Sequence, residues 1–369
     1  MTRPSVSTLP PLDLAADAVA LTAALVDVES VSGDETALAD LVEAALTAQP
    51  RLSVWRRGNV VGARTDFGRD RRVVLAGHLD TVPVADNLPS WRQDGRLYGC
   101  GTTDMKSGDA VALRVAHLVG SGALDPGVDL SWIFYDCEEV EASRNGLNAV
   151  AANDPDLLAA DLAVLLEPTA GVVEGGCQGS LRAEIRVDGR RAHSARSWLG
   201  VNAIHRAAEV LERLSNYDAR TVSVDGLPYR EGLNAVGVRG GVAGNVIPDE
   251  CVVIVNLRFA PDRDLADAEA HVREVFAGFA VMVVDGSPAA RPCLDGALAR
   301  AFAAAVGGEP RAKLGWTDVA RFSALGIPAL NFGPGDPNLA HTREEYVELD
   351  AVIAAEDALV RFLRGDAAI

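Results

Sequence analysis

Short apolar runs alternate along the chain with longer stretches in which apolar residues recur at helical spacing. Continuous runs bounded by polar, Gly or Pro residues are typical of strands buried on both faces, and they occupy residues 73–77, 130–135, 162–166 and 329–332. Helical spacing is found at residues 21–48, 106–119, 142–152 and 298–306. Because strands and helices alternate, the pattern predicts an α/β domain with a mostly parallel sheet and helices on both faces.

The pattern changes between residues 179 and 294. It predicts a strand, a helix, two strands, a helix and a strand, at residues 181–187, 201–214, 234–241, 251–259, 265–276 and 280–284. This βαββαβ order is ferredoxin-like. We therefore expect one domain made of residues 1–178 and 295–369, interrupted by an inserted domain of residues 179–294. Such an insert is a candidate lid, and a purely structural insert is the alternative.

Composition narrows the class of protein. The chain has 369 residues, of which 49% are hydrophobic, so it can bury the cores of two domains. A formal net charge of -18 argues against a nucleic-acid partner and favours solubility. Residues 1–4 lead into an amphipathic stretch at 12–26 and no apolar run approaches a membrane span, so we expect a cytoplasmic protein. The five scattered cysteines lack any C-x-x-C pair, which fits a reducing compartment and no thiolate zinc site.

Candidate chemistry gathers where apolar strands run into His or acidic residues. His78 and Asp80 stand at i and i+2, so their side chains face the same way on an extended backbone. Taken singly, each such residue also fits a solvated strand end. The carboxyl ends of parallel strands meet at one edge of a sheet, however, so residues that follow different strands converge there. The set comprises His78, Asp80, Asp104, Glu138, Glu139, Glu167 and His341.

Two His and three carboxylates are the donors that a two-metal hydrolytic site needs. Imidazole and carboxylate suit Zn²⁺ and its divalent neighbours. One carboxylate must bridge the two ions, and a general base must take a proton from the attacking water. Glu138 and Glu139 are adjacent, and successive residues on an extended backbone point to opposite sides. One of them can therefore bind metal while the other faces the water.

These motifs resemble the M20 metallopeptidases and deacylases over nearly the whole chain. The matching residues are His78-Leu79-Asp80, Asp104-Met105-Lys106, Glu138-Glu139, Glu167-Pro168 and Ala340-His341. The resemblance implies a zinc-exopeptidase-like catalytic domain with two divalent ions, Zn²⁺ with Co²⁺ as a second candidate. It also implies a cis peptide bond between Asp104 and Met105. Position by position, it implies one metal on His78 and Glu167, the other on Glu139 and His341, Asp104 as the bridge, Asp80 as the group that orients His78, and Glu138 as the general base.

The inserted domain contributes further candidates through the same resemblance. His193, which follows the first strand of this domain, matches the family histidine that reaches across a homodimer to stabilise the tetrahedral oxyanion. An ordinary loop histidine is the alternative. Asn245 and Arg258 match positions that bind the carboxylate end of the substrate. For Arg258 the alternative is a salt bridge at the strand edge.

Longer stretches resemble desuccinylases of the actinobacterial type within this family, among them "GHLDTVPVADNLPS" and "LYGCGTTDMKSGDAV". This resemblance implies hydrolysis of N-succinyl-LL-2,6-diaminopimelate to succinate and LL-2,6-diaminopimelate, on the route to lysine. The nearest alternative is another M20 deacylase, such as an N-acetylornithine deacetylase or an aminoacylase. An alternative from a different class is a metal-free binding or regulatory protein with the same fold.

The chain departs from the family pattern at three places. Many relatives have Arg where this chain has Cys100, and Asp where it has Cys137, so the groups around the metal ligands differ. Some desuccinylases carry an Arg just before the Gly-Ser at the entrance to the inserted domain, where this chain has Gln178. Arg182 and Arg196 are then the candidates for holding the succinyl carboxylate.

Overall fold

The computed structural model describes residues 9–365, which form two compact units. The first unit contains the described residues up to Gly175, residues 293–311 and the described residues from Thr317 onward. The second unit contains Gly176–Pro292 and, in addition, Ala312–Trp316. The boundaries expected from the sequence, at 178/179 and 294/295, did not include this short second segment.

The first unit is built around an eight-stranded sheet in the order β1-β2-β6-β3-β7-β18-β8-β17. Its centre is parallel and consists of β6 (Asp129–Tyr135), β3 (Arg72–His78), β7 (Leu162–Leu165) and β18 (Ala329–Asn331). These are the four strands predicted from the apolar runs, so the α/β prediction is confirmed. The outer strands are β1 (Ser53–Arg57), β2 (Val60–Arg64), β8 (Glu174–Gly175) and β17 (Arg311–Ala312).

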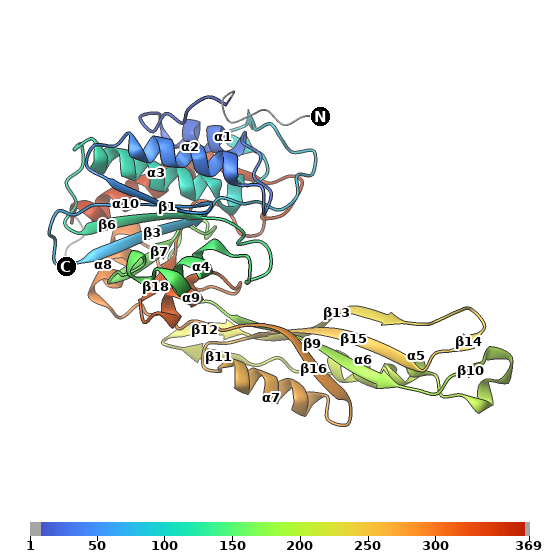
Figure 1. Ribbon diagram of the computed structural model, residues 1–369. Coiled ribbons are helices and arrows are strands. Elements are labelled where there is room, and N and C mark those ends of the chain that lie inside the picture. Colours follow the sequence, from blue (N-terminus) through green and yellow to red (C-terminus); the bar gives the residue numbers. More distant parts are fainter. Residues whose placement is uncertain (1–8, 366–369) are drawn as a thin grey trace. The chain divides into compact units, whose positions relative to one another are not determined.

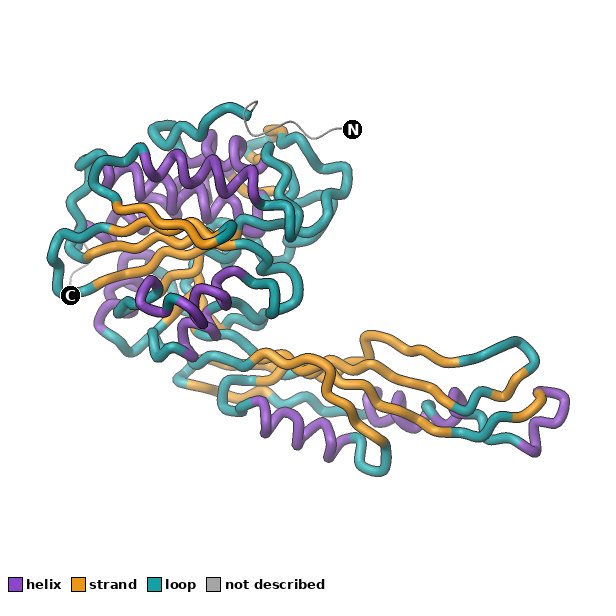
Figure 2. The backbone as a smooth tube through the Cα atoms, viewed as in Figure 1, coloured by secondary structure: helices purple, strands orange, loops and turns teal. Residues whose placement is uncertain are grey.

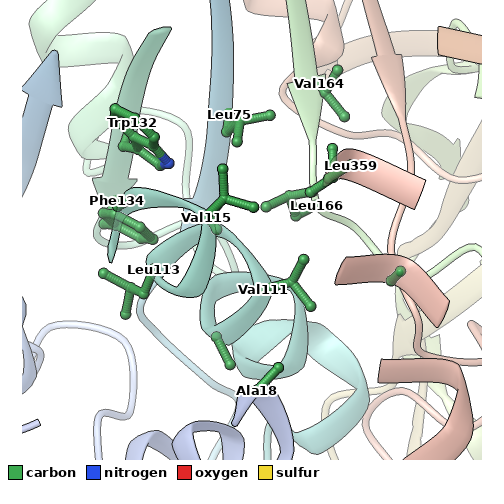
Figure 3. Packing of buried hydrophobic residues seen from close by; sticks show 14 of the residues in the cluster. Ala18, Leu75, Val111, Leu113, Val115, Trp132, Phe134, Val164, Leu166 and Leu359 are labelled. Atoms are coloured by element: carbon green, nitrogen blue, oxygen red, sulfur yellow. The ribbon is translucent and has the colours of Figure 1, made fainter. Parts of the chain in front are cut away.

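Helices cover both faces of this sheet (Figure 1). One face packs on α1 (Ala18–Val26), α2 (Thr36–Thr47), α3 (Ser107–Gly120), α8 (Ala297–Val306) and α10 (Leu349–Arg364). The other face carries α4 (Gly146–Asn153) and α9 (Val319–Ala324). Figure 3 shows Val115 of α3 beside Leu75 of β3, and Leu113 of α3 beside Phe134 of β6, in the buried core. Burying both faces explains why the central strands read as unbroken apolar runs.

The helix predicted over residues 21–48 is two helices, α1 and α2. Between them Val31 forms a parallel bridge with Thr81, and Gly33 has a φ of +94°, which a helix cannot accommodate. The apolar spacing continues across this break because both helices bury the same kind of face. The connecting segment lies beside the loop that follows β3.

A small three-stranded sheet in the first unit was not predicted. It pairs β4 (Trp91–Gln93) with β5 (Arg96–Tyr98), and β5 with β19 (Tyr346–Glu348). Between β5 and α3 the chain forms the short segment Thr102–Lys106, in which the Asp104–Met105 peptide bond is cis, as the family resemblance implied. The pairing of β5 with β19 places this segment near the residues that follow His341.

The second unit is a four-stranded antiparallel sheet in the order β13-β15-β9-β16. The strands are β9 (Gly179–Asp188), β13 (Gly232–Gly240), β15 (Glu250–Phe259) and β16 (Ala280–Ser287). Helices α5 (Ala203–Arg206), α6 (Ala208–Ser215) and α7 (Leu265–Val275) pack on one face, as Figure 2 shows. This arrangement confirms the ferredoxin-like prediction. Two antiparallel strand pairs are added to it. One is the hairpin of β11 (Thr221–Val224) and β12 (Leu227–Arg230), and the other joins β10 (Ala192–His193) to β14 (Val246–Ile247), which is distant in sequence.

Within residues 9–365, no helix is long and apolar enough to span a bilayer. The expectation drawn from residues 1–4 lies outside the described residues.

Candidate active site

His78 ends the central strand β3 and is buried between two segments that carry carboxylates. Its Nδ1 lies 3.0 Å from the backbone oxygen of Asp80, and its Nε2 lies 3.2 Å from Oδ1 of Asp104. Burial alone would lower the pKa of His78, but hydrogen bonds to the carboxylates of Asp104 and Asp80 outweigh it and raise the pKa well above the usual value. Because Nδ1 donates to a carbonyl, Nε2 is the atom that can bind a metal.

The carboxylate of Asp80 holds the loop that follows β6. Oδ1 accepts the N–H of Glu138 at 3.0 Å, and Oδ2 accepts the N–H of Glu139 at 3.1 Å and the hydroxyl of Ser32 at 2.7 Å. Burial opposes ionisation of Asp80, but these hydrogen bonds and His78 lower its pKa to about 2. Asp80 therefore positions two elements, His78 mainly through its carbonyl and the Glu pair through its carboxylate.

Asp104 lies between two imidazoles. Its Oδ1 faces Nε2 of His78 at 3.2 Å, and its Oδ2 faces Nε2 of His341 at 3.4 Å. His341 also contacts Oε1 of Glu139 at 2.7 Å, and these hydrogen bonds to Asp104 and Glu139 raise its pKa to about 10. One oxygen toward each imidazole is the arrangement that a carboxylate shared by two ions requires.

Glu138 and Glu167 complete this cluster at the ends of β6 and β7. Burial raises the pKa of Glu138 well above the usual value, and the charges of Glu167, Asp318 and Glu139 raise it further, while His78 opposes them. Glu167 is 5% exposed. It follows β7, which pairs with β3, and just before Glu167 the N–H of Leu166 donates to the oxygen of Ala76. A carboxyl group with a raised pKa can both accept and return a proton near neutral pH.

The second unit brings His193 and Asn245 together. The backbone N–H of Ser194 donates to the oxygen of Asn245 at 2.9 Å, and His193 pairs with Val246 across β10 and β14. Nδ1 of His193 accepts the N–H of Ala195 at 3.1 Å, where the short helix Ser194–Leu199 begins. An accepting Nδ1 places the proton of the neutral ring on Nε2, so this exposed histidine offers an N–H donor.

Arg258 lies near the end of β15, opposite Ser180 of β9 and Gly232 of β13. Over residues 9–365 its guanidinium forms no ion pair within 4.0 Å, and burial lowers its pKa. The strand-edge salt bridge considered from the sequence is therefore not what the structure has. Asn245 lies before the other end of β15, a strand of 10 residues that spans roughly 30 Å. Within one copy of the second unit, Arg258 and Asn245 are too far apart to contact one small molecule.

Comparison with known proteins places this geometry in a family. Residues 74–365 match the family model of Peptidase family M20/M25/M40. The chain belongs to this family. The sequence resemblance to M20 enzymes is thereby confirmed. His78, Asp104 and Glu139 form a group of side chains that could hold a metal ion, which fits the dinuclear metal dependence of this family.

The M20 chain is similar over nearly its whole length to two named proteins. It is 56% identical over 357 residues to a Mycobacterium tuberculosis protein named "Putative succinyl-diaminopimelate desuccinylase DapE", a match that covers 96% of this chain and 100% of the relative. It is 50% identical over 363 residues to the succinyl-diaminopimelate desuccinylase of Corynebacterium glutamicum, covering 96% and 98% of the two chains.

Solved structures of more distant proteins share the fold. A tripeptidase from Staphylococcus aureus matches with a TM-score of 0.78 at 20% identity, covering 98% of this chain and 100% of that one. The Bacillus subtilis YXEP protein, described as a dinuclear metal binding peptidase from the M20 family, matches with a TM-score of 0.68 at 16% identity, covering 95% and 97%.

Two residues that support the M20 site were missed in the sequence. Ser32 donates to Asp80, and Glu345 accepts the backbone N–H groups of Gly101, Thr103 and Asp104. Neither interaction has a periodic signature. One sequence feature does point to Glu345: it follows His341 by four residues. A carboxylate so close to a proposed metal ligand is a candidate for holding the backbone around the site.

The unusual cysteines next to the M20 motifs, Cys100 and Cys137, are buried. Cys137 has a φ of 58°, and both its N–H and its thiol face Oε1 of Glu35, at 3.3 and 3.4 Å. Burial and the charge of Glu35 raise the pKa of Cys137 to about 12. Cys100 donates to the oxygen of Val82 at 3.6 Å. Both thiols therefore donate hydrogen bonds to oxygen atoms of neighbouring segments.

Arg182, a candidate for holding the succinyl carboxylate, and Gln178, which stands where some desuccinylases have Arg, both have partners within the second unit. Arg182 lies 3.6 Å from Asp285, and both side chains are more than half exposed. Gln178 is buried and donates to the oxygen of Arg230 at 2.7 Å.

Proposed function

We propose that the protein removes succinate from N-succinyl-LL-2,6-diaminopimelate to give LL-2,6-diaminopimelate in lysine and diaminopimelate biosynthesis. The choice of succinate as the acyl group rests on the identity of 56% and 50% to desuccinylases over nearly the whole chain. The proposal of metal-dependent hydrolysis rests on the position of the Asp104 carboxylate between His78 and His341. A reaction that supplies an amino-acid precursor also fits a cytoplasmic enzyme, as do five free cysteines.

The donor set fits two divalent ions, Zn²⁺ with Co²⁺ as the second candidate. One ion would be held by His78 and Glu167, the other by Glu139 and His341, with Asp104 shared by both. Bound ions supply Lewis acidity to the amide carbonyl and to the attacking water. Asp80 keeps the ring of His78 and the backbone of the Glu pair in place through the contacts described above.

Glu138 is the proposed proton carrier. It takes a proton from the attacking water and returns it to the nitrogen of the departing amine. Its raised pKa supports both halves of this task, since a carboxylate with the ordinary pKa would hold the proton too weakly to deliver it.

The second unit is the proposed source of oxyanion and carboxylate binding. The Nε2–H of His193 donates to the oxygen that becomes negative in the tetrahedral intermediate. Asn245 and Arg258 bind substrate carboxylates, and an arginine without an ion-pair partner is available for such a role. Because Arg258 lies at the opposite end of β15 from His193 and Asn245, one substrate receives both sets of contacts only from two copies of the chain.

A homodimer formed by the second unit meets this requirement. Strand β13 is an edge strand, and it exposes Val236 and Val238. Helix α6 packs beside it and exposes Leu211, and α5 exposes Ile204. Apolar residues along an open strand edge favour pairing with another chain.

The test is hydrolysis of N-succinyl-LL-2,6-diaminopimelate by the purified protein, with N-acetylornithine measured beside it. We expect kcat/KM to favour the succinyl substrate, activity to disappear with a chelator, and Zn²⁺ or Co²⁺ to restore it. A higher kcat/KM for the acetyl substrate would identify another M20 deacylase. A protein that binds no metal and hydrolyses neither amide would favour a binding or regulatory role.

A further inference from the structure

The carboxylate of Glu345 lies at the junction of two segments that carry proposed metal ligands. Oε2 accepts the N–H of Gly101 at 3.0 Å, and Oε1 accepts the N–H of Thr103 at 2.8 Å and of Asp104 at 3.1 Å. Glu345 is 2% exposed. Both of its oxygens are therefore occupied by the backbone that presents Asp104, and its role is distinct from that of a metal ligand.

Further hydrogen bonds join the same two segments. The oxygen of Glu345 accepts the N–H of Gly99 at 3.1 Å, and the oxygen of Tyr346 accepts the hydroxyl of Thr103 at 2.6 Å. Tyr346 continues the connection by pairing with Tyr98 where β19 meets β5. The loop before Asp104 is thus bound to the 345–346 segment at Gly99, Gly101 and Thr103.

His341 stands four residues before Glu345 on that segment. It has a φ of 63°, a conformation that a non-glycine residue keeps only where its surroundings hold it. Its Nε2 faces Asp104 and Glu139. Among the contacts that join the two segments, the buried carboxylate of Glu345 is the one that reaches the backbone N–H of Asp104 itself.

We propose that Glu345 is a positioning residue that holds Asp104 in the orientation needed to serve two ions, and that it couples Asp104 to His341. The proposal rests on the metal centre of the proposed function. Groups that orient metal ligands contribute about 10–100-fold to metal affinity. Glu345 does so through three backbone hydrogen bonds, which a neutral amide cannot all replace because its NH₂ group donates.

The experiment is titration of the metal-free protein with Co²⁺ alone, followed by visible absorption and by the number of ions bound. We expect Glu345→Gln to weaken the more loosely bound Co²⁺ by about 10–100-fold and to change the absorption bands, which report ligand geometry. Glu344→Gln is the matched control, because Glu344 is the exposed neighbour and carries the same charge. It should bind Co²⁺ as the unaltered chain does.

Glu345→Asp keeps the carboxylate and should recover part of the affinity. If Glu345→Gln does not fold by circular dichroism, Glu345→Asp is compared with the unaltered chain, and weaker Co²⁺ binding by a folded protein supports the proposal. Two Co²⁺ ions bound with unaltered affinity and spectrum, in Glu345→Gln or in this substitute, would overturn it. An unaltered chain that binds two Co²⁺ but does not hydrolyse the succinyl substrate would contradict the proposed function and leave the role of Glu345 standing.

Discussion

Glu138 connects a local environment to a chemical step. It lies beside the proposed ligand Glu139. Burial raises the pKa of Glu138 most, the charges of Glu167, Asp318 and Glu139 raise it further, and the charge of His78 opposes them. Asp80 fixes the backbone of Glu138 and Glu139 by accepting both of their N–H groups. The direction of each side chain therefore depends on Asp80.

Replacing Glu138 by Gln should lower kcat by about 10²–10⁴-fold, because it removes the proton acceptor and donor and little else. Metal content should stay unchanged, since Glu138 is not a proposed ligand. Steady-state kinetics and metal analysis check this. Glu141→Gln, an exposed Glu on the same loop, is the control and should turn over normally. Near-normal turnover of Glu138→Gln would remove Glu138 from the mechanism.

Replacing His193 by Ala should lower kcat by about 10²–10³-fold with a smaller change in KM, because an oxyanion donor acts mainly in the transition state. The variant should fold and bind metal. His205→Ala removes another exposed His of the same unit and should leave both constants unchanged. A rise in KM alone would show that His193 binds substrate instead of stabilising the oxyanion.

At the scale of single elements, strand β3 and helix α3 meet without a side chain at Gly77. A Cβ there would lie 2.1 Å from Oδ1 of Asp109 and 2.8 Å from the terminal carbon of Met105, and both residues are fully buried. The strand that ends in His78 can thus approach α3 only through a glycine.

Gly77→Ala should lower the free energy of unfolding by about 1–3 kcal/mol, because a well-packed interior has to shift to admit the methyl group. Urea unfolding followed by circular dichroism measures this. Gly127→Ala in the same unit is the control, since its Cβ would meet only the oxygen of Leu363, at 3.9 Å. Equal stability of the two variants would show that the β3–α3 contact relaxes freely.

Elements with a strong periodic pattern could be predicted, and short paired strands could not. The four central strands were evident because burial on both faces makes them continuously apolar. Strands β5 and β19 have three residues each, and the paired residues are more than two hundred positions apart in sequence. A local pattern therefore does not predict them. The break between α1 and α2 at Val31 was not predicted, because the bridge from Val31 to Thr81 also joins residues that are distant in sequence.

The same distinction holds for the site. Convergence of His78, Asp104, Glu139 and His341 followed from the parallel sheet and the family motifs. The backbone contacts of Glu345 and the tautomer of His193 depend on loop geometry, which spacing alone does not specify. Side-chain types were therefore predictable, while the groups that hold them in place required the structure.

At the scale of the whole molecule, Arg258 and His193 lie toward opposite ends of β15, and the proposed function therefore requires a dimer. Val238→Glu places a charge on the open edge of β13 and should convert a dimer into a monomer, because a charged edge resists pairing with another strand. Light scattering after size-exclusion chromatography measures the mass. Met282→Glu is the matched control, since Met282 on the opposite edge strand is 58% exposed and Val238 is 57% exposed.

If His193 acts on the substrate of the partner chain, the Val238→Glu monomer should also lose kcat by about the same 10²–10³-fold as His193→Ala. Combining the two substitutions should then add little, because each removes the same donor from the same site. A monomer with full activity would place His193 in the site of its own chain. A chain that is monomeric before any substitution would contradict the proposed dimer directly.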